Sequence, residues 1–142
     1  MTLFIEVIMH GRTRFVEVIQ VPESLDEQQK ADFCHEFDSC IQADRPAVVL
    51  DCSKLARMDT SAIHLMLCCL EEAMKRNGDV RLAAVSPDAR VALKSYGLHH
   101  VFEMFGTIND ALKSFCWPGS IVRTYSDSEA EEPEKQVSDN AA

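Results

Sequence analysis

The chain has 142 residues, of which 46% are hydrophobic and 26% are charged, values typical of a globular protein long enough to bury its own core. Its 23 acidic side chains outnumber its 14 Lys and Arg side chains. The resulting net charge of −9 argues against a nucleic-acid surface, which needs clustered cations.

The N-terminal part of the chain predicts a strand hairpin followed by a helix. Residues 3–8 (LFIEVI) and 15–21 (FVEVIQV) are rich in strand-forming residues and flank a short stretch that contains a glycine. In the next stretch, 22–46, Asp26 and Gln29 have the spacing of a helix-capping pair. Apolar side chains then recur at helical spacing, which predicts a helix with one buried face.

A buried strand and a second helix are predicted in the middle of the chain. Residues 47–53 (AVVLDCS) form a short apolar run, typical of a central strand covered on both faces. A helix is expected over 61–76, because apolar side chains recur at helical spacing and Asn77-Gly78 is a typical end signal. The apolar stripe consists of Ile63, Met66, Leu67, Leu70, Ala73 and Met74.

The second half of the chain alternates strands and helices. The expected elements are a strand over 79–85, a helix over 86–97, a short strand or loop over 99–106 and a helix over 107–115. Ser86 and Thr107 are placed to cap the two helices. Because parallel strands need a crossover helix between them, the predicted fold class is an α/β sandwich. It would have a mixed, mostly parallel sheet of four to five strands and about four helices.

The composition changes near Ile121. Between residues 121 and 142, six acidic side chains oppose two basic ones, a net charge of −4, and large apolar groups are few. Such a segment buries too little surface to offset the entropy lost on ordering. The prediction is therefore a domain over 1–120 and an acidic disordered tail over 121–142.

The six cysteines include no CxxC pair, so the sequence predicts neither a zinc site nor a thioredoxin-like redox site. We expect reduced thiols that pack as small apolar groups, and no metal or other cofactor. The five cysteines in apolar stretches are Cys34, Cys40, Cys52, Cys68 and Cys69. No apolar run approaches the ~20 residues that a membrane-spanning helix needs, and a signal peptide is not evident. The expected location is cytoplasmic.

The triplet Asp59-Thr60-Ser61 lies between a predicted strand and a predicted helix. Short polar side chains cap helices, and such a cap contributes about 1 kcal/mol. A hydroxyl at a helix N-terminus is also a suitable phosphate acceptor, because free N–H groups and the positive end of the helix dipole tolerate the added charge of about −1.5 to −2. The residues alone leave both interpretations open.

The segment 47–112 resembles the STAS family, the fold of bacterial anti-sigma factor antagonists. In that family a strand ending in Asp leads through a short loop to an Asp-Ser-Ser-Gly pattern, which here is Asp59-Thr60-Ser61-Ala62. The resemblance implies that Thr60 accepts the phosphate, with Ser61 as the second candidate. It also implies a partner-binding surface made of Asp26, Asp59, Thr60, Ser61 and Ala62. Two departures are Ala62 in place of Gly and Glu23-Ser24-Leu25-Asp26 in place of Gly-Glu-Leu-Asp.

This resemblance implies a regulator of transcription that acts by partner switching and is not an enzyme. The unphosphorylated protein would bind an anti-sigma factor kinase, phosphorylation would release it, and a phosphatase would reverse the mark. The chain has neither GxxxxGK(S/T) nor GxGxxG, so the ATP site would belong to the kinase. The alternative is a cytosolic STAS subunit that regulates a lipid or anion transporter. A phospho-aspartate receiver would need an acidic pair after its first strand to hold Mg²⁺, where this chain offers only Glu6.

Overall fold

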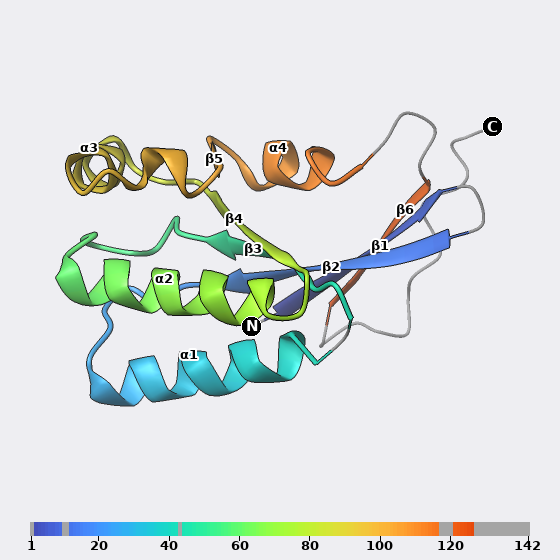
Figure 1. Cartoon of the computed structure of the whole chain (residues 1–142), viewed down its shortest axis with the longest axis horizontal. Coiled ribbons are helices and arrows are strands. Elements are labelled where there is room, and N and C mark those ends of the chain that lie inside the picture. Colours follow the sequence, from blue (N-terminus) through green and yellow to red (C-terminus); the bar gives the residue numbers. More distant parts are fainter. Residues whose placement is uncertain (1, 10–11, 43, 117–120, 127–142) are drawn as a thin grey trace.

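The computed structural model describes residues 2–9, 12–42, 44–116 and 121–126 (Figure 1). The strands are β1 (Thr2–Met9), β2 (Arg12–Gln20), β3 (Ala47–Asp51), β4 (Asp79–Ala83), β5 (Met104–Phe105) and β6 (Ile121–Ser126). The helices are α1 (Glu27–Cys40), α2 (Thr60–Met74), α3 (Pro87–Ser95) and α4 (Ile108–Lys113), with a short 3₁₀ helix η1 (Leu98–His100) after α3.

All the strands belong to one mixed sheet in the order β5-β4-β3-β2-β1-β6. Strands β2 to β5 pair in parallel, whereas β1 is antiparallel to both β2 and β6. Helices α1 and α2 lie side by side against one face of this sheet (Figure 1). The predicted α/β sandwich with a mixed, mostly parallel sheet is confirmed.

Strand β6 was not predicted. Residues 121–126 (IVRTYS) pair with β1 over six positions, so the prediction that a disordered tail begins at residue 121 is wrong for this segment. The charge count averaged a short run of strand-forming Ile, Val, Thr and Tyr together with the acidic residues that follow it. The rest of the predicted tail, residues 127–142, lies outside the described residues.

The predicted helix caps are present. Asp26, Ser86 and Thr107 each accept a hydrogen bond from the backbone N–H three residues further along the chain, at 2.9, 3.1 and 3.1 Å respectively. These contacts satisfy N–H groups that have no partner within their own helix. The starts of α1, α3 and α4 therefore follow from local sequence.

The chain leaves α2 through a tight turn that needs glycine. Asn77 adopts a left-handed conformation (φ 61°), and the next N–H, that of Gly78, donates to Ala73 O at 2.8 Å. A Cβ atom on Gly78 would lie 2.2 Å from the carbonyl oxygen of Pro46. Close backbone approach, rather than conformational freedom alone, explains this glycine.

Among the described residues two apolar clusters form the core, one on each face of the sheet. The larger one joins α1, α2 and α3 to the sheet through side chains such as Phe37, Met66 and Leu93. The smaller one includes Phe115 and Ala111 from the α4 region. Every residue of β3 is buried, as its apolar run predicted.

The apolar stripe of α2 is buried only in part, and the expected packing of the cysteines holds for some of them. Within the stripe Leu67 is half-buried and Met74 is 61% exposed. Cys52 and Cys69 are buried, whereas Cys68 is exposed, so the prediction that it packs in the core is wrong. Adjacent helical residues point about 100° apart, so the helix cannot bury both Cys68 and Cys69 against the sheet.

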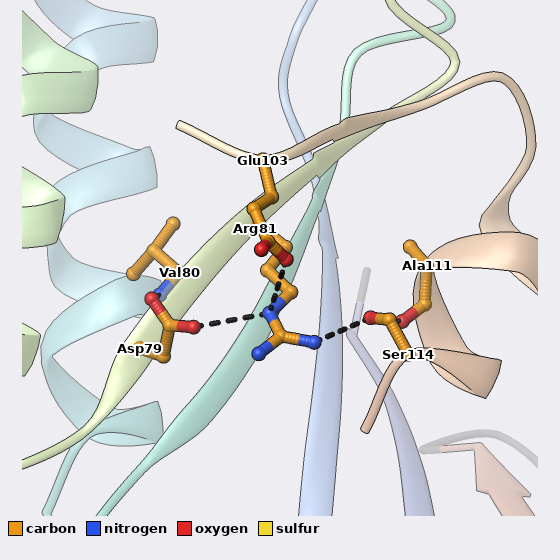
Figure 2. A network of polar contacts seen from close by, with 6 residues as sticks. All are labelled: Asp79, Val80, Arg81, Glu103, Ala111 and Ser114. Atoms are coloured by element: carbon orange, nitrogen blue, oxygen red, sulfur yellow. Dashed lines mark hydrogen bonds and ion pairs between the residues drawn. The ribbon is translucent and has the colours of Figure 1, made fainter. Parts of the chain in front are cut away.

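A polar network connects β4 to the residues before β5 and after α4, on the face of the sheet that carries the smaller apolar cluster (Figure 2). The Nε atom of Arg81 lies 3.0 Å from a carboxylate oxygen of Asp79 and 3.4 Å from one of Glu103. Its Nη1 atom donates to the hydroxyl of Ser114, and the guanidinium carbon lies 3.9 Å from the ring centroid of Phe115. This single side chain therefore holds the end of α4 and the residues before β5 against the sheet.

Candidate functional site

Two loops meet at the carboxyl ends of β2 and β3. Residues 21–26 follow β2 and residues 52–59 follow β3, and these two parallel strands end at the same edge of the sheet. The N–H of Ala56 donates to the carbonyl oxygen of Glu23 at 3.0 Å, which joins the loops. Between them lies a small hollow of about 120 Å³, whose lining includes Leu25, Leu55 and Asp59. In open α/β sheets, binding sites commonly lie at this edge.

A buried carboxylate organises the base of these loops. Asp51, the last residue of β3, is only 6% exposed. Its Oδ1 atom accepts from the N–H of Ser53 at 3.0 Å, and its Oδ2 atom accepts from Nε2 of Gln20 at 3.3 Å. A buried charged group needs such partners, so Asp51 fixes the direction in which the chain leaves the strand. Sequence reasoning noted this Asp only as the end of a strand.

Asp59 caps the next helix. It has an extended backbone, and its Oδ1 atom accepts from the N–H of Ala62 at 3.0 Å. Its own carbonyl oxygen accepts from the N–H of Ile63 at 3.0 Å. The carboxylate thus uses an N–H group at the positive end of α2.

Thr60 and Ser61 are the first two residues of α2, and both are exposed. The Thr60 hydroxyl lies on the surface, where another molecule can approach it. Its Oγ1 atom is 3.3 Å from the phenol oxygen of Tyr96, the residue that ends α3. Tyr96 is itself 56% exposed. Sequence reasoning missed it, because 36 residues separate the two hydroxyls along the chain.

The structure brings most of the predicted partner-binding residues to this edge but excludes one side chain. Asp26 is exposed at the start of α1, directly after Leu25 in the hollow beside Asp59. Ala62, by contrast, is fully buried in the larger apolar cluster. Its side chain faces the sheet, so the expectation that it contacts a partner is corrected. Its N–H group holds the cap instead.

Clusters of metal-ligating side chains and membrane-spanning helices are both absent from the described ranges. Among those residues, no group of three or more His, Cys, Asp or Glu side chains is arranged to hold a metal ion. Within the same ranges, none of the helices combines the length and the apolar character that crossing a membrane requires.

Several solved structures share this fold. The anti-sigma-factor antagonist (STAS) domain protein from Planctomyces limnophilus is 22% identical, with a TM-score of 0.62 over 70% of this chain and 89% of its own. An anti-sigma factor antagonist from Mycobacterium paratuberculosis is 21% identical, with a TM-score of 0.60 over 79% of this chain and 92% of its own. A sulfate transporter family protein from Wolinella succinogenes is 18% identical, with a TM-score of 0.55 over 70% of this chain and 83% of its own.

These likenesses concern the fold, since all three identities are low. No curated protein matches the chain. The model of the STAS domain matches residues 7–111, a range that contains β3, the Asp59 cap, Thr60 and Tyr96. The chain therefore belongs to the STAS domain family.

Proposed function

We propose that this chain is an anti-sigma factor antagonist that acts by partner switching and catalyses no reaction itself. In its unphosphorylated form it binds an anti-sigma factor that is also a serine/threonine kinase, and the sigma factor is thereby freed for transcription. Phosphorylation of Thr60 ends this binding, and a phosphatase restores it. Family membership and the likeness to proteins named as anti-sigma factor antagonists support this role.

The observation that carries the proposal is the exposed Thr60 hydroxyl at the first position of α2, beside a cap that Asp59 already makes. The positive end of the helix dipole and the free N–H groups of the first turn offset part of the phosphate charge. The helix therefore tolerates the modification. What changes is the surface that a partner would meet.

The reaction itself is supplied by the kinase. The γ-phosphoryl group of ATP passes to Oγ1 of Thr60, so that a new P–O bond forms, the bond to ADP breaks, and the hydroxyl proton goes to a base of the kinase. The chain contributes the acceptor hydroxyl and its position. This division of labour agrees with the absence of phosphate-binding glycine motifs from the sequence.

The effect on binding is electrostatic. A partner surface that fits a neutral hydroxyl would meet a phosphate of about −1.5 to −2 charge, next to the carboxylate of Asp59. Desolvating like charges at an interface costs several kcal/mol. A loss of about 3 kcal/mol weakens binding more than a hundredfold, which is sufficient for a switch.

The test uses the anti-sigma factor kinase of the same organism, purified, and four forms of the full chain. In the absence of ATP, wild type, Thr60→Ala and Ser61→Ala should all bind the kinase, whereas Thr60→Glu should bind at least tenfold more weakly than Thr60→Ala, which lacks the same hydroxyl but adds no charge. After incubation with ATP, intact-mass analysis should show one phosphate on wild type and on Ser61→Ala, and none on Thr60→Ala. The proposal fails if Thr60→Glu binds as tightly as wild type.

A second candidate function is the regulation of a transporter from the cytosolic side. The similar fold of the sulfate transporter family protein is the observation in its favour. This role predicts that the chain co-purifies with a membrane transporter and that Thr60→Glu does not reduce this co-purification. The same set of variants therefore separates the two functions.

A further inference from the structure

Tyr96 is placed in a way that burial does not explain. Its backbone is fixed, because its N–H contacts the carbonyl oxygens of Ala92 and Leu93 at 3.3 and 3.2 Å, and Leu93 is fully buried. Its ring, however, is 56% exposed, and its phenol oxygen lies 3.3 Å from Oγ1 of Thr60. An exposed tyrosine is thus held by a rigid helix end with its hydroxyl against the acceptor hydroxyl.

We propose that Tyr96 is a positioning residue of the Thr60 site, and that its phenol O–H donates a hydrogen bond to the phosphoryl group once Thr60 is modified. This inference rests on the proposed phosphorylation of Thr60. It adds the residue that ends α3 to a site whose predicted residues all lie at the starts of α1 and α2.

The chemistry of the two hydroxyls supports this assignment. In the unmodified protein either oxygen can be the donor. After modification Oγ1 carries phosphorus in place of its proton, so only the phenol can donate. The phosphoryl group adds three strong acceptor oxygens, and a hydrogen bond to an ionised acceptor is shorter and stronger than one between neutral groups. Modification therefore strengthens the contact and fixes its direction.

The two neighbours of the phosphate act in opposite senses. The carboxylate of Asp59 precedes Thr60 in the chain and repels a dianion, whereas the phenol of Tyr96 is neutral and offers a proton. A phosphoryl group at this position turns toward the donor and away from the carboxylate. The Tyr96 hydroxyl is then engaged in a hydrogen bond to the phosphate. The modification therefore changes two surface groups, the Thr60 and the Tyr96 hydroxyls, rather than one.

The hydrogen bond between Tyr96 and the phosphate would also affect partner binding. Three of the five large apolar side chains that are exposed among the described residues are Val91, Tyr96 and Val101, all in α3 or beside η1. Exposed tyrosines are typical anchors of protein interfaces. Holding the Tyr96 hydroxyl against a phosphate therefore alters a side chain that a partner docking beside Thr60 would meet.

The test installs phosphothreonine at position 60 during synthesis and follows its ³¹P NMR signal as the pH is varied. A hydrogen bond to the dianion lowers the second pKa of the phosphate. In Tyr96→Phe, which keeps the ring, we expect this phosphate pKa to rise by about 0.5. The matched control is Tyr125→Phe, the other tyrosine of the chain, which lies in β6 at the far edge of the sheet from β5. It should leave the titration unchanged.

A second measurement uses the unmodified protein with ¹³C-labelled tyrosine, whose two Cζ signals are assigned with the same two variants. Thr60→Val keeps the shape of the side chain and removes its hydroxyl, so it should move the Tyr96 signal and leave the Tyr125 signal in place. The inference is overturned if the phosphate of Tyr96→Phe titrates as in wild type. Because the phosphothreonine is installed without a kinase, that result leaves the proposed function standing. If the kinase does not phosphorylate Thr60, the proposed function is wrong, but the titration of the synthetic phosphothreonine can still be interpreted.

Discussion

Replacing Asp59 by Ala should destabilise the whole domain through one lost contact. The Oδ1 atom of Asp59 accepts from the N–H of Ala62 at 3.0 Å, and in the variant this N–H at the start of α2 loses its acceptor. Removing an N-cap side chain costs about 1 kcal/mol, within a range of roughly 0.5–2. Unfolding entropy of about 2.1 cal/mol/K per residue amounts to roughly 0.3 kcal/mol/K for this chain, so Tm should fall by about 3–4 °C.

The assay is thermal unfolding followed by circular dichroism, with urea unfolding as a second measure of the free energy. Two variants serve as controls. Asp59→Asn keeps the capping oxygen and removes the charge, so it should lose less than half as much stability as Asp59→Ala. Asp26→Ala removes the equivalent 2.9 Å contact at α1 and should cost a similar amount. Equal losses in Asp59→Asn and Asp59→Ala would refute the hydrogen-bond argument.

The remaining predictions concern other described contacts. Burial raises the pKa of the Cys52 thiol to about 12, whereas Cys68 is exposed. In the folded protein near neutral pH, iodoacetamide should therefore modify Cys68 and spare Cys52, which peptide mass spectrometry can show. Gly78→Ala should lower the free energy of unfolding by about 1–3 kcal/mol, because the new Cβ meets the carbonyl of Pro46 at 2.2 Å, and a urea titration measures the loss. Arg81→Lys keeps the charge but cannot reproduce the forked contacts in Figure 2. Urea unfolding should therefore show that the free energy of unfolding falls by about 1–2 kcal/mol. An unfolding curve identical to that of wild type would contradict the role of the network.

The local features of the fold could be predicted from sequence, because their causes lie within a few residues. Asp26, Ser86 and Thr107 cap helices through contacts that span three positions, and the pattern that identifies them is equally short. The same holds for the buried strand at 47–51, whose continuous apolar run reflects cover on both faces.

The features that escaped prediction depend on distant parts of the chain. Strand β6 exists because β1 offers a free edge, which the composition of residues 121–126 alone does not reveal. The contact between Thr60 and Tyr96 arises only when α3 packs beside the start of α2. Ala62 was assigned to a binding surface from its place in a motif, whereas the rotation of the helix determines which face it occupies. In each case the tertiary arrangement decides the outcome.

The pairing of the outer strands matters for how assays of this protein are built. Thr2 pairs with Ile19, Leu3 pairs with Ser126, and Gln20 pairs with Asp51 at the end of β3. The start of β1 and the end of β6 therefore lie at the same edge of the sheet as the carboxyl ends of β2 and β3. An affinity tag or fluorescent protein fused directly before β1 would consequently be attached at the edge of the sheet where the loops before α1 and α2 lie, and its bulk would hinder access to Thr60. Met9 and Arg12 pair with each other at the opposite end of these two strands, so a label inserted between them would be attached away from Thr60.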